Sequence, residues 1–297
     1  MIRLILHADD LGLHSAVNQA VFEGAEAGVL TSASIMVNGR AAAEALDWSK
    51  QNRGFGLGLH LNILRGRPLS DPADIPTLVD ENGLFLNSAF KLLIRGMRGR
   101  ISAEEVLIEY KRQLACLSEQ GVTPSHFDGE KHSHLFLPQT AWATGRLMAE
   151  SGINKLRLIN ETVLINKMKK KGIYLKGSVT QKLKLIFLES RTKRLSTVSK
   201  SCQGPDYTFG VLLSGRVSKA ETKRLLEVLL LLPENGTVEW MFHPGYPFAD
   251  DEPDFTREFG RFFLKDARDQ ERNILQSPEI RGLLQEHRQQ LISYSEL

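Results

Sequence analysis

Short apolar runs alternate with longer amphipathic stretches along most of the chain. The apolar runs predict strands at residues 2–6, 31–37, 56–61, 124–128, 155–159, 207–213 and 236–242. Apolar positions at helical spacing predict helices at residues 15–27, 41–50, 90–95, 103–119, 138–151 and 220–231. Strands that alternate with helices indicate βαβ units, so the pattern predicts an α/β fold with a mostly parallel sheet.

Length and composition are those of an ordinary globular protein. The chain has 297 residues, 42% of them hydrophobic and 25% charged, and one α/β barrel domain can account for this length. Its net charge is only +3, so the overall balance does not indicate a nucleic-acid partner. Cys116 and Cys202 form no C-x-x-C motif, which excludes a disulfide scaffold and a thiolate zinc cage. We therefore expect a cytoplasmic protein, with no signal peptide and no membrane-spanning run.

One segment departs strongly from this balance. Between Lys167 and Lys200 there are eleven Lys or Arg residues and a single acid, Glu189, so this stretch carries a charge of +10. Its apolar residues recur at helical spacing, which predicts an apolar stripe with basic flanks at Val179, Leu183, Ile186 and Phe187. Two interpretations remain open. The region at about 161–204 is either a solvated insertion or a site of peripheral contact with an anionic membrane, at its inner face.

Polar side chains collect where the predicted strands end. In parallel α/β folds the loops after the carboxyl ends of strands hold the functional groups. Taken alone, Asp9 or Asp10 could cap the next helix, and His60 could be a core histidine. Their joint occurrence at strand ends favours a functional site. The candidates are Asp9, Asp10, His60, Asn62, His126, Asp128, Glu130, His132, His134, Arg157, Glu239 and His243.

The stretch from Ser125 to His134 is the richest in such groups. If it is extended, its alternate residues share one face, and these are His126, Asp128, Glu130, His132 and His134. Such a face must line water, a metal or a substrate, because an apolar core would not accept it. Carboxylates and imidazoles at separate strand ends suit Zn²⁺, Mn²⁺, Co²⁺ or Ni²⁺. A metal with open positions polarises a carbonyl and lowers the pKa of bound water.

Four motifs, in the same order, resemble those of the YdjC/ChbG family of carbohydrate deacetylases, which is distantly related to the NodB-type polysaccharide deacetylases. The resemblance covers nearly the whole chain. It implies a single domain over residues 1–297, an irregular (β/α) barrel of about seven strands, and metal-dependent removal of the acetyl group from an N-acetylated amino sugar. The motifs are Ala8-Asp9-Asp10-Leu11-Gly12, Gly58-Leu59-His60-Leu61-Asn62, His126-x-Asp128-x-x-x-His132-x-His134 and Glu239-x-x-x-His243-Pro244-Gly245.

The resemblance also implies residue roles. Asp10 and His60 correspond to metal ligands, Asp9 to the base that activates water, and His243 to the acid that protonates the leaving amine. Arg157 and Glu239 correspond to residues that support them. Asn62, His126, Asp128, His132 and His134 are expected to bind substrate or hold the other side chains in place.

Glu130 departs from the family pattern, because the third ligand of the family is usually a histidine. Either Glu130 binds the metal, or His126 or His132 replaces it, or the site binds metal weakly. We favour Glu130, which would shift the preference from Zn²⁺ toward a harder ion such as Mn²⁺ or Mg²⁺, with Co²⁺ and Ni²⁺ also open.

Other functions stay possible on these residues. A sugar-binding protein that has lost catalysis, a phosphoester hydrolase and a chitooligosaccharide deacetylase are the alternatives. The stretch from Pro205 to Gly210 is more similar to the branch of the family that acts on lipid-linked sugars and hopanoids. The expected partner is an N-acetylated amino sugar, and a homodimer is possible.

Overall fold

The structure is a computed structural model that describes residues 2–175, 177–198, 202–213, 218–230, 235–248, 254–261 and 266–297. Its centre is a curled, all-parallel sheet with the strand order β4-β3-β2-β1-β6-β5. The α/β class and the parallel sheet are thereby confirmed. The strands of the described residues are β1 (Ile2–Leu11), β2 (Ser32–Ile35), β3 (Gly56–Leu61), β4 (Phe127–Gly129), β5 (Tyr207–Phe209) and β6 (Gly236–Phe242).

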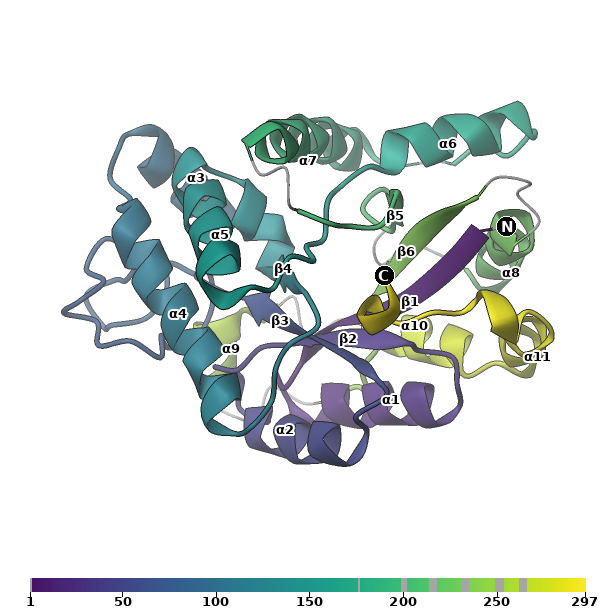
Figure 1. Cartoon of the computed structure of the whole chain (residues 1–297), viewed down its shortest axis with the longest axis horizontal. Helices are drawn as coiled ribbons and strands as arrows, with labels where there is room; N and C mark the ends of the chain where they lie inside the picture. The colour runs from purple at the N-terminus through teal and green to yellow at the C-terminus, as the bar shows by residue number, and fades with distance from the viewer. Residues whose placement is uncertain are drawn as a thin grey trace.

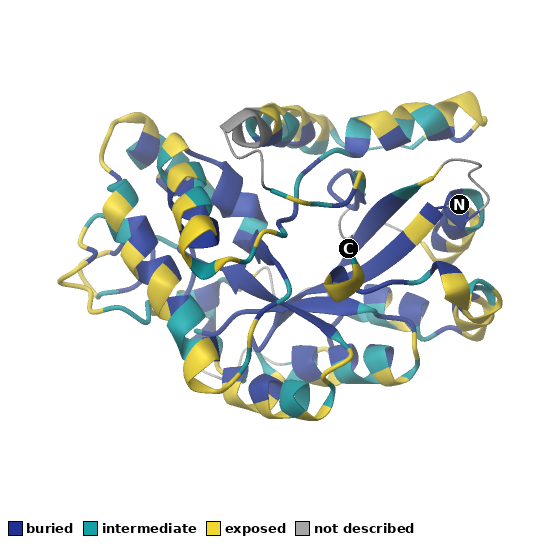
Figure 2. Cartoon of the chain, viewed as in Figure 1, coloured by how far each residue is buried: buried dark blue, intermediate teal, exposed yellow. Residues whose placement is uncertain are grey.

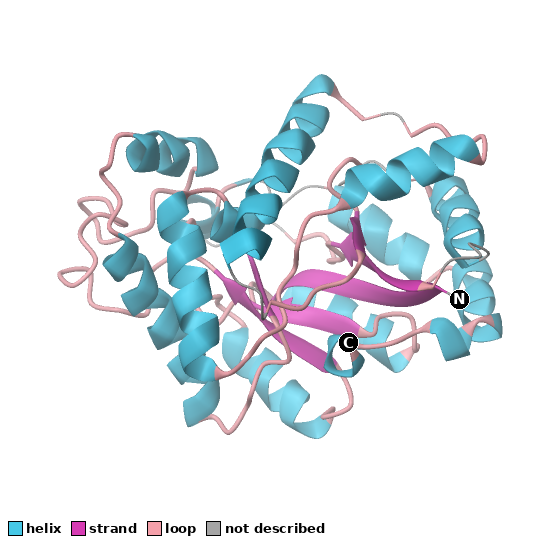
Figure 3. Ribbon diagram, turned by 45° about the horizontal axis from the view of Figure 1, so that its top comes forward, coloured by secondary structure: helices cyan, strands magenta, loops and turns pink. Residues whose placement is uncertain are grey.

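Helices cover the sheet on both sides (Figures 1 and 3). In the view of Figure 1, α1 and α2 lie below the sheet and α6 and α7 lie above it. In the described part of the chain after β6 there are three further helices, in a region for which the sequence pattern predicted no elements. The helices are α1 (Ser15–Glu26), α2 (Ala42–Gln51), α3 (Ala89–Met97), α4 (Ala103–Glu119), α5 (Pro138–Ser151), α6 (Glu161–Lys170), α7 (Val179–Val198), α8 (Lys219–Leu230), α9 (Phe255–Phe259), α10 (Ala267–Leu275) and α11 (Pro278–Glu286).

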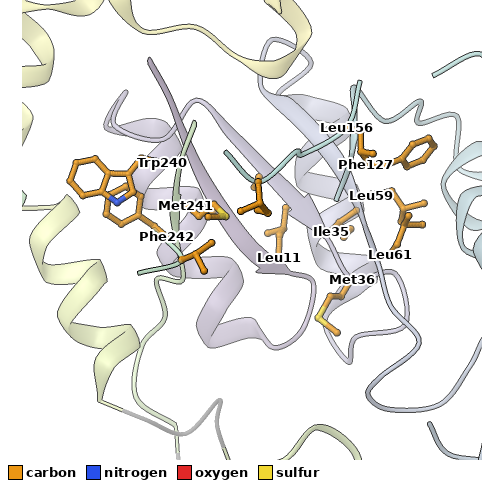
Figure 4. Packing of buried hydrophobic residues seen from close by; sticks show 14 of the residues in the cluster. Leu11, Ile35, Met36, Leu59, Leu61, Phe127, Leu156, Trp240, Met241 and Phe242 are labelled. Carbon is orange, nitrogen blue, oxygen red and sulfur yellow. The ribbon is translucent and has the colours of Figure 1, made fainter. Parts of the chain in front are cut away.

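The sheet is buried on both faces, as Figure 2 shows. In β1 only Arg3 is exposed, and in β6 every residue after Gly236 is buried. Strands covered on both faces read as nearly continuous apolar runs, which is why they were recognisable in the sequence. Residues such as Leu59, Phe127 and Trp240 pack into one apolar core along the strands (Figure 4).

The prediction of a seventh strand at residues 155–159 is wrong. Here the described chain forms only two single bridges, from Leu156 to Phe127 and from Lys155 to Gln203. The following backbone donors bond to side chains instead, Ile159 N to Thr192 Oγ1 at 3.0 Å and Asn160 N to Thr208 Oγ1 at 2.9 Å. A strand ladder cannot continue once side chains take its donors, so the sheet is a six-stranded half-barrel.

The strand predicted at residues 207–213 is shorter than expected, ending at Phe209. Gly210 has a φ of 124°, and the amides of Val211 and Leu212 donate to the Glu161 carboxylate at 2.8 and 3.1 Å. Glu161 is the first residue of α6, in the predicted insertion, and its carboxylate connects α6 to the end of β5.

Among the described helices, none is both long and apolar enough to cross a bilayer.

Candidate active site

A cavity of about 230 Å³ opens at the carboxyl ends of the strands. Its wall comes from four parts of the chain: the end of β1, the short 3₁₀ segment η1 (Glu130–Leu135) after β4, the inner face of α7, and the ends of β5 and β6. The basic insertion predicted from the sequence therefore contributes directly to the cavity. The lining residues are Asp9, Asp10, Glu130, Lys131, His132, Gln181, Lys184, Gly210, Val211, Met241 and His243.

The backbone is strained where it enters this cavity. Asp10, Lys131 and His132 have φ values of 67°, 51° and 62°, in the left-handed region that non-glycine residues rarely adopt. The remaining described non-glycine residue of this kind is Asn87, which accepts a hydrogen bond from Arg65 at 2.6 Å. Such strain persists where the surrounding structure imposes it, and it concentrates at functional sites.

Asp10, His60 and Glu130 form a group that could hold a metal ion. One atom from each lies within 4.8 Å of the others. His60 Nε2 is 3.6 Å from Asp10 Oδ1 and 3.7 Å from Glu130 Oε2. Asp10 Oδ1 and His60 Nε2 are buried, and neither has a hydrogen-bond partner among the described residues. Buried polar atoms are rarely left in this state unless an ion, water or ligand completes them.

The remaining oxygens of Asp10 and Glu130 and the Nδ1 atom of His60 are bonded to other side chains of the protein. Arg268 donates to Asp10 Oδ2 at 2.8 Å, and Arg65 Nε donates to Glu130 Oε1 at 2.5 Å. His60 Nδ1 lies 2.9 Å from Asp128, an arrangement typical of metal-binding histidines. Each of the three thus has one atom fixed by the protein and one directed toward the others.

Charge balance in this group shifts two pKa values. Burial by itself raises the pKa of Glu130, but His60 and Arg65 outweigh it and hold the pKa below its usual range. Burial lowers the pKa of His60, and the neighbouring Asp128 carboxylate raises it well above 6.5. Without a cation the imidazole is therefore protonated, and its positive charge lies between the carboxylates.

Two further groups in the described residues have metal-ligand geometry, but apart from His60 Nε2 their atoms are already bonded to neighbouring side chains. They are His7 with His126 and Asp128, and Asp9 with His60 and Asp128. His7 Nε2 lies 3.0 Å from His126 Nε2, and Arg157 binds both Asp9 and Asp128. The other polar atoms of these groups bond to one another or to neighbouring side chains such as Arg157. Within the described chain, neither group has a pair of unpartnered atoms like Asp10 Oδ1 and His60 Nε2.

Arg157 is the centre of a buried cluster of three carboxylates. Its guanidinium lies 2.7 and 2.9 Å from the two oxygens of Asp9, 2.8 Å from Asp128 and 2.6 Å from Glu239. Burial raises the pKa of Asp9, but Arg157 outweighs this effect and holds the pKa well below its usual value. Asp9 is thus ionised and firmly oriented at the cavity wall. We call Arg157, Asp9, Asp128 and Glu239 the Arg157 cluster.

His243 faces Asp9 across the cavity. Its Nε2 atom is 3.7 Å from Asp9 Oδ2, while Nδ1 is 3.8 Å from Glu271 on α10. Burial lowers the pKa of His243, but hydrogen bonding to Glu271 and the charge of Asp9 raise it above its ordinary value. An imidazole whose protonated form is favoured and a carboxylate thus line the same cavity as Asp10.

Comparison with known proteins identifies the family of this chain. A family model described as "YdjC-like protein" matches residues 3–286. The chain belongs to the YdjC-like family. It is 34% identical over 133 residues to a carbohydrate deacetylase of Clostridium beijerinckii, covering 45% of this chain and 51% of that protein. It is 35% identical over 133 residues to a chitooligosaccharide deacetylase of Serratia marcescens, covering 44% of this chain and 50% of that protein.

The YdjC-like chain thus spans about half the length of the curated relatives it matches. Its fold resembles that of a crystal structure from Enterococcus faecalis V583, a protein provisionally named for cellobiose-phosphate cleavage. The TM-score is 0.72 at 21% identity, and the similarity covers 99% of this chain and 97% of the other. This likeness supports the fold alone.

The prediction that residues 126–134 form one extended polar face is wrong for the YdjC-like chain. β4 ends at Gly129, and the left-handed residues Lys131 and His132 turn the backbone into η1. His132 lines the cavity. His134 instead packs beneath it, with Nε2 3.2 Å from the carbonyl oxygen of Arg157.

Two other candidates lie away from the cavity. His126 stacks on Tyr294 at 3.6 Å between ring centroids and approaches Gly58 so closely that a Cβ there would lie 2.4 Å from its ring. Asn62 is buried and accepts from the amides of Leu64 and Arg65, which fixes the loop that carries Arg65. Both side chains therefore shape the surroundings of the cavity rather than its wall.

Several residues of the site were not found from the sequence. Arg65 and Arg268 hold the candidate metal group, Glu271 supports His243, and Gln181 and Lys184 line the cavity from α7. Arg65 follows Asn62 by three positions, which was a signal that could have been used. Arg268 is 258 positions from Asp10, and no local pattern reports such a pairing.

Proposed function

We propose that this protein is a metal-dependent hydrolase that removes the acetyl group from an N-acetylated amino sugar, with the ion held by Asp10, His60 and Glu130. The observation that carries the proposal is the unpartnered, buried pair Asp10 Oδ1 and His60 Nε2 beside the ionised Asp9. The relatives named carbohydrate deacetylase support the same reaction, although this chain covers only about half of their length.

The donor set fits a divalent cation. The group offers two carboxylates and one imidazole. Mn²⁺ and Mg²⁺ bind such ligands more readily than ions that prefer thiolates do, and Zn²⁺, Co²⁺ and Ni²⁺ also bind them. Such an ion, when bound, polarises the acetyl carbonyl and acidifies water. Its positive charge would also replace the proton of His60 between the carboxylates.

The residues of this chain supply the proton transfers. Asp9 is ionised and oriented by Arg157. It accepts a proton from the attacking water while the oxygen of that water forms a bond to the acetyl carbon. His243 lies 3.7 Å from Asp9 and its pKa is raised, which favours the protonated form that donates a proton to the amide nitrogen as the carbon–nitrogen bond breaks. The products are acetate and a free amino sugar, so one water is consumed for each acetyl group released.

The cavity limits the substrate. Its 230 Å³ is less than the roughly 300–1,000 Å³ of sites that enclose drug-sized ligands. We therefore assign the cavity to one acetamido sugar, with the rest of a glycan or carrier outside. In the narrower form of the proposal the sugar is lipid-linked or part of a surface glycan, and the protein works at the inner face of a membrane, where the basic segment contacts anionic lipid.

Acetate release tests the proposal. The protein is stripped with a chelator, reloaded with one divalent ion at a time, and incubated with N-acetylhexosamine conjugates. We expect acetate only after reloading, and one ion bound per chain by elemental analysis. Sugar binding without acetate under any ion would favour the sugar-binding alternative, and phosphate release from phosphoesters would favour the other hydrolase.

A further inference from the structure

α7 separates the cavity from solvent and presents two different faces. Its inner face buries Leu185 and Leu188 and contributes Gln181 and Lys184 to the cavity wall. Its outer face carries Val179, Leu183 and Ile186 at helical spacing. These three side chains are 62–73% exposed, which is unusual for residues of this size.

A second helix, outside the basic segment, has the same character. On α3 the side chains of Phe90 and Met97, seven positions apart and hence on one face, are 70% and 77% exposed. The opposite face of α3 buries Leu92 and Gly96. An amphipathic helix normally turns its apolar face toward the core, whereas α3 leaves large apolar side chains in solvent.

The two helices pack on adjacent residues of the segment between η1 and α5. A Cβ on Gly96 of α3 would lie 2.3 Å from Leu137, so α3 packs closely on that side chain, and Phe187 of α7 contacts the neighbouring Phe136 at 6.0 Å between ring centroids. Figure 1 shows α7 above the sheet and α3 at the upper left, beside α5. We call Phe90, Met97, Val179, Leu183 and Ile186 the docking face.

Basic residues surround the docking face. Residues 90–100 contain Lys91, Arg95, Arg98 and Arg100 and no acid. Along α7, Lys182 and Lys193 are exposed. The single acid of the basic segment, Glu189, accepts from the amide of Thr162 at 2.6 Å and so pairs with the start of α6.

We propose that the docking face binds the surface of an anionic lipid bilayer, with its apolar side chains entering the headgroup boundary and its Lys and Arg residues contacting lipid phosphates. Exposed apolar residues flanked by clustered positive charge are what such binding requires. A second copy of this chain is the less favourable occupant, because the two basic surfaces would repel. The cavity lies about one helix diameter, roughly 10 Å, behind the docked surface of α7.

Vesicle co-sedimentation tests the docking face without any assay of catalysis. We expect the protein to bind phosphatidylcholine vesicles more strongly as their phosphatidylglycerol content rises, and to be released by salt. The variant Phe90→Ser/Met97→Ser/Leu183→Ser/Ile186→Ser should bind anionic vesicles about tenfold more weakly or worse. Its thermal unfolding should match the unsubstituted protein, because all four side chains are exposed.

Three further variants sharpen the result. Ile108→Ser changes an apolar residue on α4 that is 43% exposed, and it should bind vesicles as the unsubstituted protein does, whereas Leu183→Ser alone should weaken binding. Lys91→Gln/Arg98→Gln/Lys182→Gln/Lys193→Gln should bind more weakly and lose most of the salt dependence. Three results would overturn the proposal. They are equal vesicle binding by all variants, vesicle binding that does not depend on phosphatidylglycerol content, and self-association of the protein that the four serine substitutions abolish.

The link to catalysis rests on the proposed function and can fail separately. The four-serine variant should deacetylate a short soluble acetamido sugar at the normal rate and a vesicle-borne one more slowly. Vesicle binding with no acetate from either substrate would leave the docking face standing and reject the deacetylase. Normal acetate release from both substrates by a variant that no longer binds vesicles would show that docking does not serve the reaction.

Discussion

Two groups of buried charged residues lie side by side in this protein, and they are completed in different ways. In the Arg157 cluster the guanidinium reaches all three carboxylates at 2.6–2.9 Å. In the candidate metal group, arginines hold one oxygen of Asp10 and one of Glu130, while Asp10 Oδ1 and His60 Nε2 have no partner among the described residues.

This difference indicates that the Arg157 cluster stabilises the fold, whereas the candidate metal group is arranged to bind a ligand. Removing a charge from a satisfied buried cluster leaves the remaining charges uncompensated, so such a cluster stabilises one arrangement of the fold. A group with unpartnered atoms costs free energy in the folded protein until a ligand binds. His60 and Asp128 are 2.9 Å apart and connect the two, so the Arg157 cluster fixes the orientation of a residue in the candidate metal group.

Loss of Arg157 should have the largest effect. Arg157→Met leaves Asp9, Asp128 and Glu239 buried without their common partner, and we expect the free energy of unfolding to fall by about 3–5 kcal/mol or more. Glu130→Gln, which keeps an oxygen for Arg65, should cost far less in the metal-free protein. Urea unfolding of both variants measures the difference, and equal midpoints would remove the distinction between the two groups.

Asp9 tests whether the Arg157 cluster also serves catalysis. Asp9→Asn keeps the shape of the side chain but cannot accept the proton of water, so turnover should fall by roughly two orders of magnitude or more. Metal content, measured by elemental analysis, should not change because Asp9 is outside the proposed ligand set. Turnover at the normal rate would place the base elsewhere, with Glu130 or Asp128 next to be tested.

Glu130 tests the donor set of the candidate metal group. Glu130→His replaces an oxygen ligand with nitrogen and releases Arg65, so we expect the relative affinity for Zn²⁺ over Mn²⁺ to rise by about tenfold. Competition titrations with a fluorescent chelator measure both affinities. Glu130→Gln is the control and should weaken both ions, and an unchanged ratio in the histidine variant would exclude Glu130 as a ligand.

The parts predicted from the sequence are those with local signals. Doubly covered strands appear as apolar runs, and Asp9, Asp10 and His243 of the cavity wall and His60 of the candidate metal group stand where those runs end, so the sheet and the place of these side chains could be foreseen. The left-handed turn at Lys131 and His132 could not, since neither residue is a glycine and tertiary contacts impose the strain.

Other features depend on contacts between distant segments. Arg268 reaches Asp10 from a helix near the end of the chain, and the roles of Arg65 and Arg268 become visible only when the chain is folded. The expected strand at residues 155–159 failed for a related reason, because Thr192 and Thr208 from later segments accept from the amides of Ile159 and Asn160, where the ladder would continue. Apolar pattern alone cannot report which partner a backbone amide will find.

His60 of the candidate metal group and the carboxylates of the Arg157 cluster should also respond to pH in opposite ways, which gives the smallest effect and the last prediction. Asp9 and Asp128 have lowered pKa values in the folded protein, so they contribute stability above their ordinary pKa of 3.8 that is lost as the pH falls through the lower folded values. His60 has a raised pKa, so its contribution is complete below 6.5 and is lost as the pH rises through the folded value.

A metal ion needs neutral His60, so binding should release its proton near neutral pH, and affinity should rise by up to about tenfold per pH unit until His60 is deprotonated. Titration calorimetry with Mn²⁺ in buffers of different ionisation enthalpy counts the protons released, and we expect about one. In His60→Gln this release should disappear, and binding will also be weaker. Binding without proton release in the unsubstituted protein would show that His60 is already neutral and would contradict the charge balance inferred for the candidate metal group.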